Sequence, residues 1–175
     1  MFKRLFALGI AALVIVFDQL SKSLIMQHFQ PGGVQRITDF FDLVYARNTG
    51  AAFSLFADQP GWQRVFFITI ALLASAVILV LLQRKSLSLM ARIGLGLVLG
   101  GALANVFDRL TLGYVVDFLW FHIQQYGWPA FNVADSAIVL GAAFLIFDGM
   151  KTTPHHTPNT KTTVDRPSDE VTRCD

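Results

Sequence analysis

Four long apolar windows constrain this chain more than any other feature of its sequence. Each is close to the ~20 residues that a helix needs to cross a bilayer. Only 15% of the residues are charged and the mean hydropathy is +0.52, whereas about a quarter of a soluble domain is charged. We therefore predict an all-α integral membrane protein with four transmembrane helices. The windows run roughly Leu5–Met26, Val65–Leu82, Ile93–Phe107 and Ala134–Met150. The third is the shortest, so we expect flanking residues to complete its crossing.

The first window has two interpretations. Lys3 and Arg4 precede an apolar stretch, which is the arrangement of a cleavable signal peptide. However, the stretch continues past Asp18 and Lys22, and no small-x-small cleavage site follows promptly. We expect a retained membrane anchor.

Basic residues in short loops predict the orientation, because cytoplasmic loops carry an excess of Lys and Arg. With both termini inside, the densest basic patch, Gln83–Arg92, is cytoplasmic, and all Trp and Tyr residues fall on the outer side. The cytoplasmic cations are then Lys3, Arg4, Arg84, Lys85, Arg92 and Lys151, and the outer ones Arg36, Arg47, Arg64 and Arg109.

The connections differ in character. The outer loop, about 27–64, mixes β-branched and aromatic residues over Val34–Phe56, which predicts short strands in a small extracytoplasmic β-containing loop domain. In the connection Arg109–Val133, Pro129 prevents one continuous helix. Residues 1–150 would form the transmembrane domain, and the polar segment 151–175 a disordered cytoplasmic tail.

Two aspartates lie where a membrane protein seldom tolerates charge. Asp117 sits within a run of valines and aromatics, and Asp135 at the mouth of the fourth window. Carboxylates at membrane depth cost roughly 2.5–3.5 kcal/mol and are usually functional. Two that share a site tend to share a proton, which would equip them to activate water against an amide bond. The alternative is that each caps a helix.

Other polar residues suggest supporting roles. Asn105 and Arg109 share a helix face, where Arg109 would pair with Asp108, point at a substrate, or extend to water as an interfacial arginine. Asp18 and Lys22 form an i, i+4 pair that is either a structural salt bridge or adjacent to a substrate.

Small and turn-forming residues are more ambiguous. Gly96 and Gly100 form a Gly-x-x-x-Gly pair that favours close helix packing, while Gly101 would pack or leave room for a ligand. Asn48, in Asn-Thr-Gly, is either ordinary turn chemistry or part of a site.

Other function classes lack their signals. The four His and one Cys do not have metal-ligand spacing, no Ser has the His partner of a hydrolase triad, and no glycine loop cradles phosphate. We expect no metal, no cofactor and no nucleic-acid partner.

Five motifs together resemble the bacterial lipoprotein signal peptidase family (signal peptidase II). They occur in the expected order between Phe17 and Ser136, without departures. They are Phe17-Asp18-Gln19-Leu20-Ser21-Lys22, Asn48-Thr49-Gly50-Ala51-Ala52-Phe53-Ser54, Gly100-Gly101-x-x-x-Asn105-x-x-Asp108-Arg109, Val115-Val116-Asp117-Phe118 and Phe131-Asn132-Val133-Ala134-Asp135-Ser136.

The resemblance implies an aspartic endopeptidase of the bacterial inner membrane, and we expect it to be a monomer. It would remove signal peptides from prolipoproteins by cutting before a diacylglyceryl cysteine, at the outer face, with the outer loop as a cradle. Asp117 and Asp135 match the catalytic pair. The substrate-binding or supporting positions are Asp18, Lys22, Asn48, Gly101, Asn105, Asp108, Arg109 and Asn132.

Two rival functions stay open. A transporter also uses charged residues within the membrane, but its charges would be spread through the bilayer rather than gathered at one face. A membrane adaptor would need an apolar packing surface and no pair of carboxylates.

Overall fold

The structure, a computed structural model, describes residues 2–50, 61–123 and 126–151. Two pairs of strands interrupt the helices along the chain. They are α1 (Phe2–His28), β1 (Val34–Arg36), β2 (Phe41–Asn48), α2 (Trp62–Leu81), α3 (Leu89–Thr111), β3 (Val115–Ile123), β4 (Tyr126–Gly127) and α4 (Val133–Lys151). The predicted tail lies outside the described residues except for Lys151, which ends α4.

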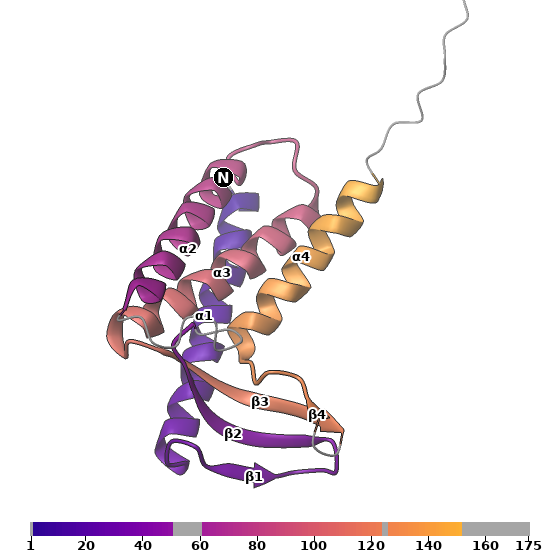
Figure 1. The fold of residues 1–175 in the computed structure, drawn as a ribbon. Coiled ribbons are helices and arrows are strands. Elements are labelled where there is room, and N and C mark those ends of the chain that lie inside the picture. Colours follow the sequence, from indigo (N-terminus) through magenta and orange to yellow (C-terminus); the bar gives the residue numbers. More distant parts are fainter. Residues whose placement is uncertain (1, 51–60, 124–125, 152–175) are drawn as a thin grey trace, which may run out of the picture.

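All four helices are long and apolar enough to cross a membrane, which confirms the four predicted spans. They form one bundle in which α3 is the most buried and packs on each of the others. The N-terminus and the α2–α3 loop lie at one end of the bundle, and the strands lie at the other (Figure 1).

Flanking residues complete the third span, as expected, because α3 extends beyond the apolar window Ile93–Phe107 at both ends. At 23 residues α3 is longer than α2 or α4. Its N-terminus is extended because Ser88 caps the helix, with its Oγ accepting a hydrogen bond from the Ala91 N–H at 3.0 Å. Its C-terminus continues past Phe107 because the polar residues there find partners inside the protein, as described below.

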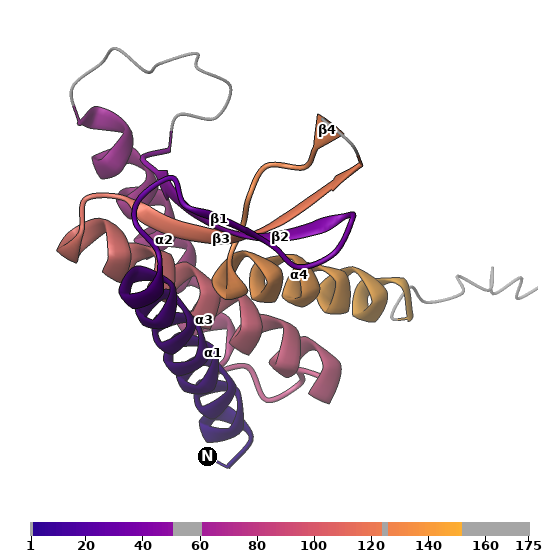
Figure 2. The same ribbon diagram turned by 90° about the horizontal axis from the view of Figure 1, so that it is seen from below.

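The predicted fold class, all-α, was incomplete. Both connections at one end of the bundle contribute to a single antiparallel sheet with the order β1-β2-β3-β4. Strands were predicted in the first connection, but β3 and β4 lie in the second, where only an interrupted helix was considered. The sheet stands beside the ends of the helices (Figure 2).

The pairing of β2 with β3 positions the site. Phe41 lies opposite Phe121 and Ala46 opposite Asp117, with a β-bulge between Leu43 and Ala46. Residues 69 positions apart, such as Asn48 and Asp117, are thereby brought within hydrogen-bonding distance. β3 reads as a nearly continuous apolar run because its first half, Val115–Phe118, is buried.

Small residues allow the helices to approach closely, as the Gly-x-x-x-Gly pair predicted. A Cβ on Gly96 would lie 2.6 Å from the carbonyl oxygen of Ala7, and one on Gly100 would lie 2.7 Å from that of Ala11. A side chain at either position would therefore separate α3 from α1.

Candidate active site

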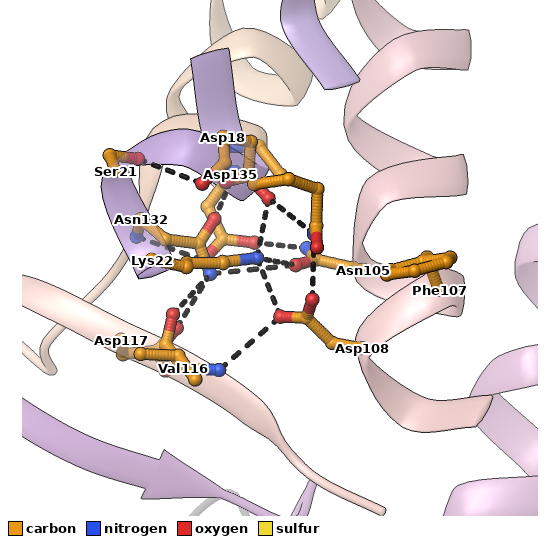
Figure 3. A network of polar contacts seen from close by, with 12 residues as sticks. Asp18, Ser21, Lys22, Asn105, Phe107, Asp108, Val116, Asp117, Asn132 and Asp135 are labelled. Carbon is orange, nitrogen blue, oxygen red and sulfur yellow. Dashed lines mark hydrogen bonds and ion pairs between the residues drawn. The ribbon is translucent and has the colours of Figure 1, made fainter. Parts of the chain in front are cut away.

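Asp117 and Asp135 come from different elements and are joined by one residue, Asn132. Asp117 belongs to β3, and Asp135 lies in the first turn of α4. The Asn132 side-chain amide donates to Asp117 Oδ1 at 2.7 Å, and its backbone N–H donates to Asp135 Oδ2 at 3.3 Å (Figure 3). Asn132 is fully buried, so it fixes the two carboxylates relative to each other.

The capping alternatives are now resolved. Asp117 lies in a strand and caps no helix. Asp135 does take part in a capping box, because its N–H donates to Asn132 Oδ1 at 2.9 Å while Asn132 donates back to its carboxylate. Its second oxygen, Oδ1, faces Asn105 instead. Capping therefore orients Asp135 without using the whole carboxylate.

Two further side-chain amides bind the carboxylate oxygens that Asn132 leaves free. Asn48 Nδ2 donates to Asp117 Oδ2 at 2.9 Å, and Asn105 Nδ2 donates to Asp135 Oδ1 at 2.8 Å. Each amide is itself oriented, because its oxygen accepts from the Gly50 N–H or from Lys22 Nζ. Asn48 is thus both a turn residue and a partner of Asp117.

A buried ionic cluster lies behind the pair. Lys22 Nζ is 2.6 Å from Asp18 Oδ2 and 2.8 Å from Asp108 Oδ2, and none of the three side chains is more than 2% exposed. Gln19 Nε2 completes the cluster by donating to Asp108 Oδ1 at 2.7 Å. At this depth Asp18 and Lys22 form a structural bridge that a substrate would not reach.

This cluster is tied to both aspartate-bearing segments through the backbone. Asp18 Oδ1 accepts from the N–H of Ala134, the residue before Asp135, at 2.8 Å. Asp108 Oδ2 accepts from the N–H of Val116, the residue before Asp117, at 3.4 Å. One buried lysine therefore sets the positions of both catalytic candidates.

Arg109 does not pair with its sequence neighbour Asp108, which was one of the three interpretations of its role. It forms no salt bridge with Asp108 or with any other described acid. Its Nη1 donates to the Asn105 carbonyl at 3.3 Å, its guanidinium carbon lies 5.1 Å from the centre of the Phe67 ring, and its Nε is buried without a hydrogen-bond partner in the described part of the chain. The guanidinium therefore retains donors for a bound group.

Two cavities adjoin the pair, and Pro129 and Ala130 line both of them. The first, about 530 Å³, is lined by Asp117, Arg109 and Asn48, among others. The second, about 660 Å³, is largely apolar and contains Asp135. Each aspartate thus lines a separate cavity.

The environment perturbs Asp117. Burial, together with the nearby charge of Asp135, raises the pKa of Asp117 to about 6, although the hydrogen bonds from Asn48 and Asn132 oppose the shift. At neutral pH this carboxyl therefore holds a proton more often than an ordinary aspartate does.

Gly101 supports the site by its size alone. A Cβ at this position would collide with the carbonyl oxygen of Ala134, so the α4 backbone occupies the space that a ligand was considered to fill. All ten residues predicted for the site thus lie in or against one cluster.

Sequence reasoning missed three residues. Gln19 binds Asp108, and its signal was an amide between two charges in an apolar helix. Arg47 lines the first cavity and lies 4.9 Å from the centre of the Tyr114 ring. Phe67 also lines this cavity, but nothing distinguishes it from the other apolar residues of its helix.

The fold and the site together define an integral membrane protein with a buried polar cluster at one end of its helices. The family model described as "Signal peptidase (SPase) II" matches residues 10–151. Two solved structures, each described as a bacterial membrane enzyme, are 29% identical with a TM-score of 0.75. They cover 87% and 85% of this chain and 92% and 94% of their own.

Curated relatives agree. The lipoprotein signal peptidase of Paraburkholderia phytofirmans is 47% identical over 144 residues, covering 82% of this chain and 84% of the relative. That of Burkholderia thailandensis is 46% identical over the same length, covering 82% and 87%. The chain therefore belongs to the signal peptidase II family, a family of membrane proteases in lipoprotein maturation.

Proposed function

We propose that this protein is an aspartic endopeptidase that removes signal peptides from diacylglyceryl-modified prolipoproteins, cutting before the lipidated cysteine. The main support is the pair of hydrogen bonds from Asn132, which hold Asp117 and Asp135 together beside the two cavities that they line. A structural role would require no such pair, because the buried cluster around Lys22 already links the elements.

The surroundings of the two carboxyl groups suggest their roles. With its pKa raised to about 6, Asp117 is the member that holds the shared proton and donates it to the scissile carbonyl oxygen. Both of its oxygens accept from amides, so the O–H of the protonated form must point toward the cavity. Asp135 is the base that receives a proton from the attacking water.

The proton transfers balance over one turnover. Water oxygen bonds to the carbonyl carbon while Asp135 takes a water proton and Asp117 gives its own, forming a neutral diol. The C–N bond then breaks as Asp135 protonates the leaving nitrogen, and Asp117 recovers a proton from a diol hydroxyl. Both carboxyl groups return to their starting states, so no other proton carrier is needed.

The two cavities would receive different parts of the substrate. The apolar cavity beside Asp135 suits hydrocarbon, which would enter sideways from the bilayer. The cavity lined by Arg109 and Asn48 suits oxygen atoms of the peptide backbone or of the lipid esters, since Arg109 has donors to spare.

We further propose that the site faces outward from the bacterial inner membrane, with both termini in the cytoplasm. The α2–α3 loop lies at the end of the bundle away from the sheet, and its basic residues are those expected of a cytoplasmic face. The protein would act as a monomer with membrane lipids around it.

The test uses full-length protein in detergent with a diacylglyceryl-modified prolipoprotein. Asp117→Asn and Asp135→Asn should each reduce cleavage by about 10³-fold or more, measured as loss of the signal-peptide shift on a gel. Asp39→Asn is the matched control, because Asp39 is exposed and paired only with Arg36. Cleavage retained in either site variant would refute the pair. If the wild-type protein cleaved no substrate, but cells without it grew poorly or lost a transport activity, the adaptor or transporter would be favoured.

A further inference from the structure

A second polar cavity lies at the opposite end of the bundle from the aspartates. Its volume is about 510 Å³, and it is formed where α1 begins, α2 ends and α3 begins. Of the seven described residues that line it, five are cations and none is an acid. The cations are Lys3, Arg4, Arg84, Lys85 and Arg92.

Arg92 distinguishes this cavity from an ordinary basic surface. It lies in the first turn of α3 and is only 3% exposed. Its Nη2 donates to the Arg84 carbonyl at 2.9 Å, but its Nε is buried without a hydrogen-bond partner among the described residues. A buried charge with an unused donor is costly unless a partner of opposite charge meets it.

Within residues 2–50, 61–123 and 126–151, no acid lines this cavity. Asp148, the acidic residue near this end of α4, accepts a hydrogen bond from Ser88 Oγ and is not among the lining residues. Basic residues at a cytoplasmic helix end are common and need no ligand. A buried guanidinium in a cavity with four further cations is not explained by that tendency.

We propose that this cavity binds the phosphate group of an anionic glycerophospholipid. The guanidinium of Arg92 offers planar donors that match phosphate oxygens, and the surrounding cations neutralise the remaining charge. The same phosphate chemistry is found in the free ion. The lipid is the assigned source because the cavity lies at the ends of helices that are long and apolar enough to cross a membrane, where lipid headgroups are expected.

The experiment measures lipid binding to full-length protein. Protein purified in detergent is titrated with phosphatidylglycerol, and bound lipid is counted by native mass spectrometry. Phosphatidylcholine serves as the zwitterionic comparison and inorganic phosphate as a competitor. We expect one phosphatidylglycerol to be retained in preference to phosphatidylcholine.

The variants separate a built site from general attraction. Lys85→Gln should weaken phosphatidylglycerol binding about fivefold, since each cation near an anionic lipid contributes about that factor. Lys151→Gln is the matched control, because it removes one lysine at the same end of the bundle but outside the cavity. Its binding should stay within about twofold of the wild type. Arg84→Gln is a second exposed variant with the same expectation as Lys85→Gln.

Three results would overturn the assignment. Equal weakening by Lys85→Gln and Lys151→Gln would mean non-specific surface attraction. Equal retention of phosphatidylcholine would remove the role of net charge. Binding of inorganic phosphate without any retention of phosphatidylglycerol would make the site one for the free ion.

Discussion

The two ends of the helix bundle treat buried charge in opposite ways. At the sheet end, the ammonium of Lys22 is enclosed by two carboxylates and an amide oxygen, all from the protein. At the other end, buried Arg92 has one carbonyl partner and a cavity lined by further cations. The first arrangement has its counter-charges within the chain, whereas the second has none among the residues that the structure describes.

This difference in buried charge suggests a different role for each end of the bundle. The completed cluster gives rigidity, so Asp117 and Asp135 stand on a fixed base with oxygens facing the cavities. The group around Arg92 instead gathers cations with no described acid among them. Rigid positioning suits chemistry that depends on fractions of an ångström, while an uncompensated cation suits binding of an anion.

Breaking the completed cluster should have the largest effect on stability. Lys22→Met leaves Asp18 and Asp108 as buried, unpaired charges, which should cost about 3–5 kcal/mol and lower the Tm in detergent markedly. Arg36→Gln is the control, because it removes an exposed pair with Asp39. Equal Tm values for the two variants would show that the buried cluster does not stabilise the fold.

Moving Asp135, the proposed general base, without removing any charge should have the next largest effect. Gly101→Ala places a methyl group against the Ala134 carbonyl and should shift the start of α4, costing about 1–3 kcal/mol. The resulting movement of Asp135 should lower kcat by about 10²-fold.

Gly9→Ala is the matched control for this substitution. Gly9 also lies in a spanning helix, but a Cβ there meets nothing within 4 Å, so activity should be unchanged. If Gly101→Ala behaved like Gly9→Ala, the close approach of α3 and α4 would not matter for the site.

The pH dependence sharpens the proposed roles. If Asp117 must be protonated, kcat/KM should fall about tenfold per pH unit above its pKa of about 6. Asn48→Ala removes a hydrogen bond that favours the carboxylate, so the pKa should rise and this limb should move to higher pH. A shift to lower pH would contradict the assignment of Asp117 as the acid.

The smallest effect is expected at the incomplete end. In detergent free of anionic lipid, Arg92→Met removes a buried charge that pairs with no described acid, so no ion pair is lost. The free energy of unfolding should fall by no more than about 1 kcal/mol, the contribution of the hydrogen bond to the Arg84 carbonyl. Thermal unfolding beside Lys22→Met tests the contrast directly. A loss as large as that of Lys22→Met would mean that Arg92 is already compensated within the protein.

Much of the site was predictable because its residues are polar in an apolar chain. Asp117, Asn105 and Lys22 stand out where membrane segments seldom carry charge, and the motifs that contain them match one family. Their partners were less predictable. Asp108 binds Lys22, 86 positions away, rather than adjacent Arg109, since neighbours on a helix do not face each other.

The four spans could be predicted from the chain alone, since the length of an apolar helix is a local property that hydropathy measures directly. The pairing of β3 with β2, and the single amide of Asn132 that joins the two aspartates, became visible only in the folded protein. Strand pairing and the packing of α3 against α1 and α4 are contacts between distant segments. Their geometry depends on the whole bundle, so no local pattern in the chain specifies it.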